Sequence, residues 1–119
     1  MWTEFWDMHS GGSQKLEWSK IYIEAKEDEA ISVFYSRFGR NPDRVTCTCC
    51  GEDYVTYESE TLEEATDFQR NRGYELPIEK RGMTIEEYEK QEHVLVIREH
   101  EISDHERNVS VPEEGYRWV

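Results

Sequence analysis

Three cysteines are crowded into one short stretch of the chain, "CTCC", which begins at Cys47. Cys47 and Cys50, followed by a glycine, fit the C-x-x-C-G pattern of a zinc knuckle, in which two thiolates supply half of a tetrahedral zinc site. A closed site needs two further ligands, and no second C-x-x-C or H-x-x-x-H follows in the sequence. Cys49 and His9 are the candidates for the missing positions.

A β-hairpin is the competing interpretation of the same stretch. In an extended strand Cys47 and Cys49 share one face and Cys50 lies opposite at the turn, where the thiols act as small apolar side chains. Redox chemistry is a third alternative. Because half of the zinc ligands are missing, the pattern favours the hairpin. We therefore expect no cofactor, with zinc at Cys47 and Cys50 left open.

Other segments with residues suited to chemistry lack the context that catalysis requires. The "SGGSQK" segment precedes another strand-like run, whereas a phosphate-binding loop lies between a strand and a helix. His9 beside Ser10 could form a base and nucleophile pair with Cys49, but no local signature supports this pairing. We expect a protein without enzymatic activity.

Acidic density is the strongest remaining feature of the sequence. The formal net charge of −13 argues against direct nucleic-acid binding, because phosphate contacts require a basic surface. Between residues 52 and 69 there is no Lys or Arg, and there are seven acids: Glu52, Asp53, Glu58, Glu60, Glu63, Glu64 and Asp67. Such a surface could imitate a phosphate backbone and bind a basic groove of a partner protein. The alternative is an ordinary solvated surface.

Hydrophobic periodicity and turn residues predict the elements that position these acids. Two S/T-x-x-E capping boxes, one beginning at Thr61 and one at Thr84, mark helix starts. The predicted elements are a strand at 20–25, a helix that ends at Gly39, a hairpin over 44–59, a helix from Thr61 to near Gly73, a short helix after Thr84 and a strand over 93–99.

This order predicts an α+β fold of the βαββαβ ferredoxin-like type, an antiparallel sheet with helices on one face. We expect a single domain over residues 1–119, with a core at 20–99 that includes a short helical insertion. An aromatic-rich segment at 1–19 should pack on this core as an extra strand or hairpin, and the tail at 100–119 should dock on it. The apolar "VLVI" strand would lie at a sheet edge and would need cover.

Location is constrained by composition as well. No apolar run approaches the roughly 20 residues of a membrane span. The first residues carry acids where a signal peptide carries bases, and the clustered cysteines do not form a secreted disulfide framework. We expect a cytoplasmic protein without membrane contact.

Several segments of the sequence resemble a family of small proteins of tailed bacteriophages. The segments "TEFWDMHSGG", "IYIEA", "FYSRFG", "VTCTCCGEDY" and "TLEEAT" carry this resemblance, which covers residues 1–72. It implies a phage origin and a bacterial host cytoplasm, and it transfers no catalytic or binding residue. By class it suggests accessory proteins that block host defence, of which anti-CRISPR proteins are an example.

Two functional hypotheses follow. The first is a phage-encoded, non-enzymatic protein that inhibits or redirects a host protein or nucleic-acid enzyme, through acidic mimicry of nucleic acid. The alternative is a small structural or regulatory domain stabilised by zinc at Cys47 and Cys50.

Overall fold

The structure is a computed structural model that describes residues 1–6, 18–42, 45–47, 54–66, 84–112 and 116–118, without the side chains of 45–47 and 116–118. The elements in chain order are β1 (Trp2–Trp6), β2 (Lys20–Ile23), α1 (Glu27–Phe38), β3 (Val45–Cys47), β4 (Val55–Ser59), α2 (Leu62–Ala65), α3 (Ile85–Glu89), β5 (Val94–Ile97), a 3-10 turn (Glu99–Glu101), α4 (Asp104–Arg107) and β6 (Tyr116–Trp118).

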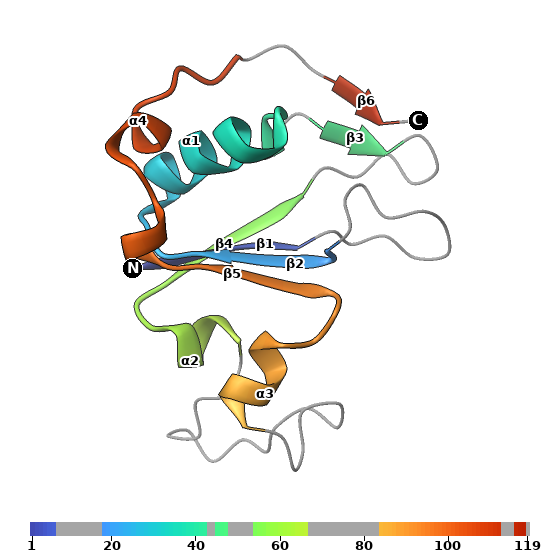
Figure 1. Cartoon of the computed structure of the whole chain (residues 1–119). Coiled ribbons are helices and arrows are strands. Elements are labelled where there is room, and N and C mark those ends of the chain that lie inside the picture. The colour runs from blue at the N-terminus through green and yellow to red at the C-terminus, as the bar shows by residue number, and fades with distance from the viewer. Residues whose placement is uncertain (7–17, 43–44, 48–53, 67–83, 113–115, 119) are drawn as a thin grey trace.

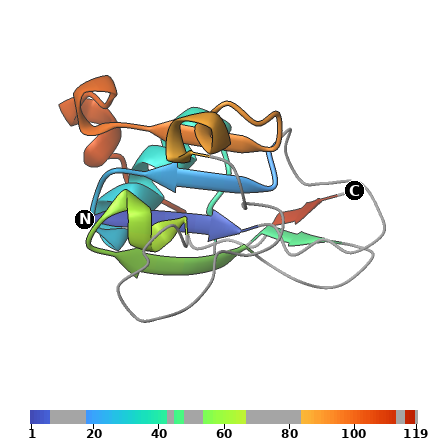
Figure 2. The same ribbon diagram turned by 90° about the horizontal axis from the view of Figure 1, so that it is seen from below.

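Four of the strands form one mixed sheet in the order β4-β1-β2-β5 (Figures 1 and 2). β1 is antiparallel to both of its neighbours, whereas β2 and β5 are parallel. β3 and β6 form a separate parallel pair. The first strand of the chain therefore lies in the interior of the main sheet, and β4 and β5 are its two outer strands.

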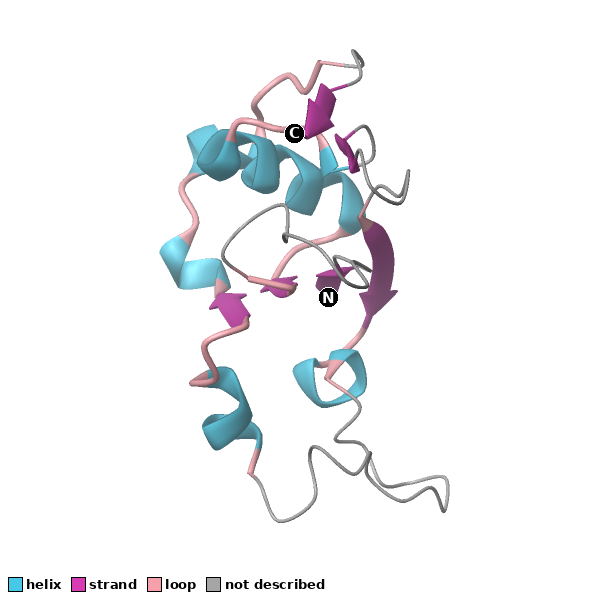
Figure 3. Ribbon diagram, turned by 90° about the vertical axis from the view of Figure 1, so that its right-hand side faces the viewer, coloured by secondary structure: helices cyan, strands magenta, loops and turns pink. Residues whose placement is uncertain are grey.

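Helices cover both faces of this sheet, α1 and α4 on one and α2 and α3 on the other (Figures 1 and 3). Because alternate side chains of a strand point to opposite faces of the sheet, the core consists of two apolar clusters, one on each face. The cluster under α1 contains Phe5, Ile21 and Phe34. The cluster under α2 and α3 contains Tyr22 and Val94, together with other side chains from alternate strand positions.

The α+β class is confirmed, but three details of the predicted fold are wrong. The sheet is not wholly antiparallel, because β2 pairs with β5 in parallel. Helices lie on both faces, which gives the apolar β5 cover on each side. The strand predicted within 1–19 is present as β1, but its expected place is wrong: it is a central strand and not an addition to a finished core, because its alternating side chains fill both clusters.

The predicted hairpin over 44–59 is also wrong in its pairing. β3 pairs with β6, and β4 pairs with β1, so these two strands belong to different sheets. The intervening residues 48–53 lie outside the described part of the chain. Period-2 patterning identifies strands correctly but does not say which strand is the partner.

The C-terminal part of the chain contacts α1 through one arginine. Arg37 Nε donates to the Glu106 carboxylate on α4 at 2.8 Å, and Arg37 Nη2 donates to the Glu101 carbonyl at 2.7 Å. Hydrogen bonds from Ser103 and the Arg37 guanidinium lower the pKa of Glu106. Ile102, between these two acidic residues, is buried in the cluster under α1.

Gly39 ends α1 in the left-handed conformation, with φ 71°. Its N–H donates to the Tyr35 carbonyl at 2.7 Å, which satisfies a carbonyl at the helix end. A Cβ at this position would meet no atom within 4 Å, so the cost of a side chain is confined to the backbone conformation.

The Gly39→Ala substitution is therefore expected to lower the free energy of unfolding by about 1–2 kcal/mol, the cost of placing an alanine in the left-handed region. Urea denaturation measures it. Gly39→Asn is the matched control and should lose less, because asparagine tolerates this conformation. Equal stability of the alanine variant and the wild type would contradict the account.

Candidate acidic binding surface and its adjoining cavity

Four of the seven predicted partner-binding acids lie in the described part of the chain, on one edge of the molecule. β4 is an outer strand of the main sheet, and α2 follows it after a short turn (Figure 1). We call the four residues the acidic edge: Glu58, Glu60, Glu63 and Glu64. The other three predicted acids lie outside the described residues: Glu52, Asp53 and Asp67.

The turn into α2 is built by the predicted capping residue. The Thr61 side chain accepts a hydrogen bond from the Glu64 N–H at 3.2 Å, which satisfies a free donor at the helix start. α2 covers Leu62–Ala65, and the Thr66 hydroxyl donates back to the Leu62 carbonyl at 2.7 Å. The predicted helix end near Gly73 lies outside the described residues. The fixed turn holds the acids of β4 and α2 next to one another.

Two carboxylates of the acidic edge have partners within the chain. Glu58 Oε2 accepts a hydrogen bond from the Glu27 N–H at the start of α1, at 2.8 Å. Glu64 Oε2 accepts from the Glu60 N–H at 3.3 Å. The side chains of Glu60 and Glu63 are exposed. These two carboxylates are therefore the ones best placed to meet another molecule.

A cavity of about 400 Å³ adjoins the acidic edge, between the sheet and α2. Strand register explains its floor: Glu4 lies opposite Tyr57, and Trp6 lies opposite Lys20. Directly opposite residues of antiparallel strands have their side chains on the same face. The lining residues are Glu4, Trp6, Lys20, Tyr57, Glu58, Ser59, Glu64 and Ala65.

Glu4 contributes a carboxylate to the lining of this cavity, and only 9% of the surface of Glu4 is exposed. It accepts a hydrogen bond from the Tyr22 hydroxyl, which also lies 3.0 Å from the Tyr88 hydroxyl. Because an ionised carboxylate only accepts, the single proton of Tyr22 goes to Glu4. Tyr88 is then the donor to Tyr22. Burial, and after it the Glu4 charge, raise the pKa of Tyr22 far above its ordinary value of 10.0.

Replacement of Tyr22 by phenylalanine is expected to lower the free energy of unfolding at pH 7 by about 1–3 kcal/mol, because buried polar groups lose a hydrogen-bond partner. A pH series separates this effect from packing. The raised pKa of Tyr22 stabilises the fold fully below pH 10, and this contribution falls by up to about 1.4 kcal/mol per pH unit above it. In urea denaturation above pH 10, the free energy of unfolding of the Tyr22→Phe protein should fall less steeply with pH than that of the wild type. If the wild type and Tyr22→Phe lost stability equally above pH 10, the hydrogen-bond network of Glu4, Tyr22 and Tyr88 would be contradicted.

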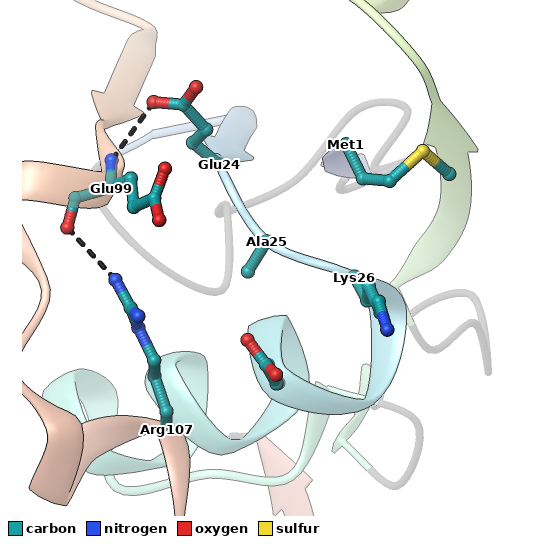
Figure 4. Close-up of a pocket in the computed structure, with 7 residues that line it drawn as sticks. Met1, Glu24, Ala25, Lys26, Glu99 and Arg107 are labelled. Carbon is teal, nitrogen blue, oxygen red and sulfur yellow. Dashed lines mark hydrogen bonds between the residues drawn. The ribbon is translucent and has the colours of Figure 1, made fainter.

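A second, smaller cavity of about 190 Å³ lies at the start of α1. Figure 4 shows that its polar groups bond to one another: Glu24 accepts from the Glu99 N–H at 3.0 Å, and Arg107 donates to the Glu99 carbonyl at 3.0 Å. These contacts join the residue after β2 to the C-terminal part of the chain. We interpret this cavity as a structural junction.

The predicted metal ligands cannot be placed together. His9, Cys49 and Cys50 lie outside the described residues, and for Cys47 only the backbone in β3 is described. Within the described residues no group of three or more His, Cys, Asp and Glu side chains is arranged to hold a metal ion. Zinc at Cys47 and Cys50 stays a prediction.

Sequence reasoning missed the cavity and its chemistry. Glu4, Trp6 and Tyr22 were assigned only to strands or to general packing, and Tyr57 only to the predicted hairpin. The available signal was the alternation in "WTEFW", which places Glu4 between two tryptophans on one face of a strand. An acid in that position is unusual unless it has a partner.

Comparison with protein-family models, curated proteins and solved structures finds no match to this chain. Among the helices of the described residues, none has both the length and the apolar character that crossing a bilayer requires. The acidic edge and the cavity beside it are therefore the features of this chain that bear on its function.

Proposed function

We propose that this protein is a non-enzymatic binding module that recognises a basic surface of another protein through the acidic edge. The observation that carries the proposal is the exposure of Glu60 and Glu63 in a stretch, 52–69, that contains no Lys or Arg. Two acids elsewhere in the described structure form ion pairs with arginines, and one of them is Glu89, which pairs with Arg98 at 2.6 Å. The other is Glu106, which pairs with Arg37 at 2.8 Å.

An unmatched negative surface has two physical consequences for association. It raises the rate of encounter with a basic partner, and it disfavours partners of the same charge. Both effects weaken as salt screens the charges over about 10 Å at 0.1 M ionic strength. Direct binding to nucleic acid is disfavoured for the same reason.

The resemblance to tailed-bacteriophage proteins supports a host protein as the partner. A basic groove that normally holds nucleic acid is the kind of surface that a dense set of carboxylates can occupy. The proposed consequence is inhibition or redirection of that host protein in the bacterial cytoplasm.

The experiment that tests the proposal is affinity capture of the tagged protein from bacterial lysate, with washes at 50 mM and 500 mM salt and identification by mass spectrometry. We expect a specific protein with a basic groove, retained at low salt and lost at high salt. Capture of no specific protein, or retention that does not depend on salt, would contradict the proposal.

A further inference from the structure

We infer that the cavity beside the acidic edge receives one lysine or arginine side chain of the basic partner. The inference rests on the proposed function and adds to it an anchoring contact. Electrostatic attraction between two surfaces is diffuse, whereas a cavity that accepts one side chain fixes the orientation of the partner.

The size of the cavity suits one long side chain. Its volume of about 400 Å³ lies near the lower end of the range of small-ligand sites, roughly 300–1,000 Å³. The acidic edge contributes directly to its lining, since Glu58 and Glu64 belong to both. A partner held at the acidic edge would therefore have basic side chains next to the opening.

An exposed aromatic ring gives the cavity an affinity for cations. Tyr57 is 54% exposed, so much of its surface is open to an approaching molecule. The Lys20 ammonium already lies 5.5 Å from the centroid of the Trp6 ring. An ammonium or a guanidinium over an aromatic face is attracted by the quadrupole of the ring. Lys20 of the chain itself makes this contact with Trp6, so the ring that we infer to receive the partner's cation is that of the exposed Tyr57.

Carboxylates supply the charge that selects a cation over a neutral side chain. Glu4 is nearly buried, and its charge is poorly screened by water at that depth. Glu64 adds a second negative charge from α2, against the single positive charge of Lys20.

The carboxylate of Glu58 does not add to this charge. It bonds to the Glu27 N–H at the start of α1, on the other side of the sheet. The strand register agrees, since Glu58 lies opposite Thr3, whose hydroxyl donates to the Ala25 carbonyl. The charged groups that face the inferred cation are therefore Glu4, Glu64 and Lys20.

The test uses N-acetyl-arginine methylamide and N-acetyl-lysine methylamide as probes, followed by NMR on the whole chain. The Trp6 indole N–H signal, assigned by its loss in Trp6→Phe, and the Tyr57 amide signal are the readouts. We expect saturable shifts of both signals with the two cationic probes and none with the neutral N-acetyl-norleucine methylamide. Absence of saturable shifts with both cationic probes would overturn the inference.

Matched variants separate the cavity from the general negative charge. Glu64→Gln and Tyr57→Ala should each weaken probe binding at least threefold. Glu63→Gln, which removes the same charge from an exposed neighbour on α2, should change it by less than a factor of two. Equal weakening by Glu63→Gln and Glu64→Gln would overturn the cavity inference.

The proposed function is tested separately, by whether a basic protein is captured from the lysate and by how that protein binds the variants. Capture of a salt-sensitive basic protein whose binding is unchanged in Tyr57→Ala and Glu64→Gln would leave the proposed function standing and overturn the cavity inference. Failure to capture any such protein counts against the proposed function, whatever the probes do.

Discussion

Replacing Glu60 and Glu63 together with lysine is expected to weaken binding of the captured basic partner at least tenfold at 100 mM salt. Both side chains are exposed on the acidic edge, so the substitutions change the surface charge with little effect on packing. Close charge pairs across an interface couple by about 1.5 kcal/mol or more, and 1.4 kcal/mol is a factor of ten in affinity. Isothermal titration calorimetry or surface plasmon resonance measures the dissociation constant.

The control for this variant is Asp28→Lys combined with Asp104→Lys. These exposed acids lie in the first turns of α1 and α4, on the opposite face of the sheet. The net charge changes by the same amount, so a loss caused by total charge would be equal in the two proteins. Equal affinities of the two double variants for the partner would contradict recognition by the acidic edge.

Replacing Phe34 with alanine is expected to lower the free energy of unfolding by about 3–5 kcal/mol, the usual cost of removing a buried aromatic ring. The Phe34 side chain is fully buried at 0% exposure. Its ring centroid lies 4.9 Å from that of Phe5, 4.8 Å from that of Phe38 and 5.1 Å from that of Tyr54. The ring thus joins α1 to the central strand and to the residue before β4. Urea denaturation followed by circular dichroism measures the loss.

Tyr57→Ala provides the comparison for this prediction. Its ring is exposed, so the free energy of unfolding should change by about 0.5 kcal/mol or less. The same variant should lose binding in the probe experiment. A stability loss for Tyr57→Ala as large as that of Phe34→Ala would contradict the assignment of Tyr57 to a surface site.

The local elements of this fold could be predicted because their signals are local. α1 follows from apolar residues at helical spacing between an acidic start and Gly39, and α3 follows from the capping box at Thr84. In α3 the Thr84 side chain accepts from the Glu87 N–H at 3.1 Å, and the Glu87 carboxylate accepts from the Thr84 N–H at 3.3 Å. Such contacts span a few residues and need no tertiary information.

Strand partners could not be predicted because pairing is decided between distant residues. β1 and β4 pair across about fifty intervening residues, and β3 pairs with β6 near the other end of the chain. The period-2 pattern of each strand is compatible with several neighbours. Residues 44–59 resembled a hairpin because only a short connection separates their two strand-like runs. The position of β1 in the middle of the sheet could not be inferred from its alternating pattern alone.

The same reason explains the partial prediction of the candidate site. The acidic edge is a run in the sequence, so composition was enough to find it. The cavity combines β1, β2, β4 and α2, and the alternation in "WTEFW" marks Glu4 as unusual but does not show that Tyr22 and the cavity lie beside it. A site assembled by strand register becomes visible only when that register is known.

The most direct measurement is an amide chemical-shift map of the labelled protein as the captured basic partner is added. The account predicts that the largest shifts fall on β4 and α2, over Val55–Ser59 and Leu62–Ala65, and that the Tyr57 amide and the Trp6 indole shift with them. Shifts confined to α1 and α4, on the opposite face of the sheet, would contradict recognition through the acidic edge.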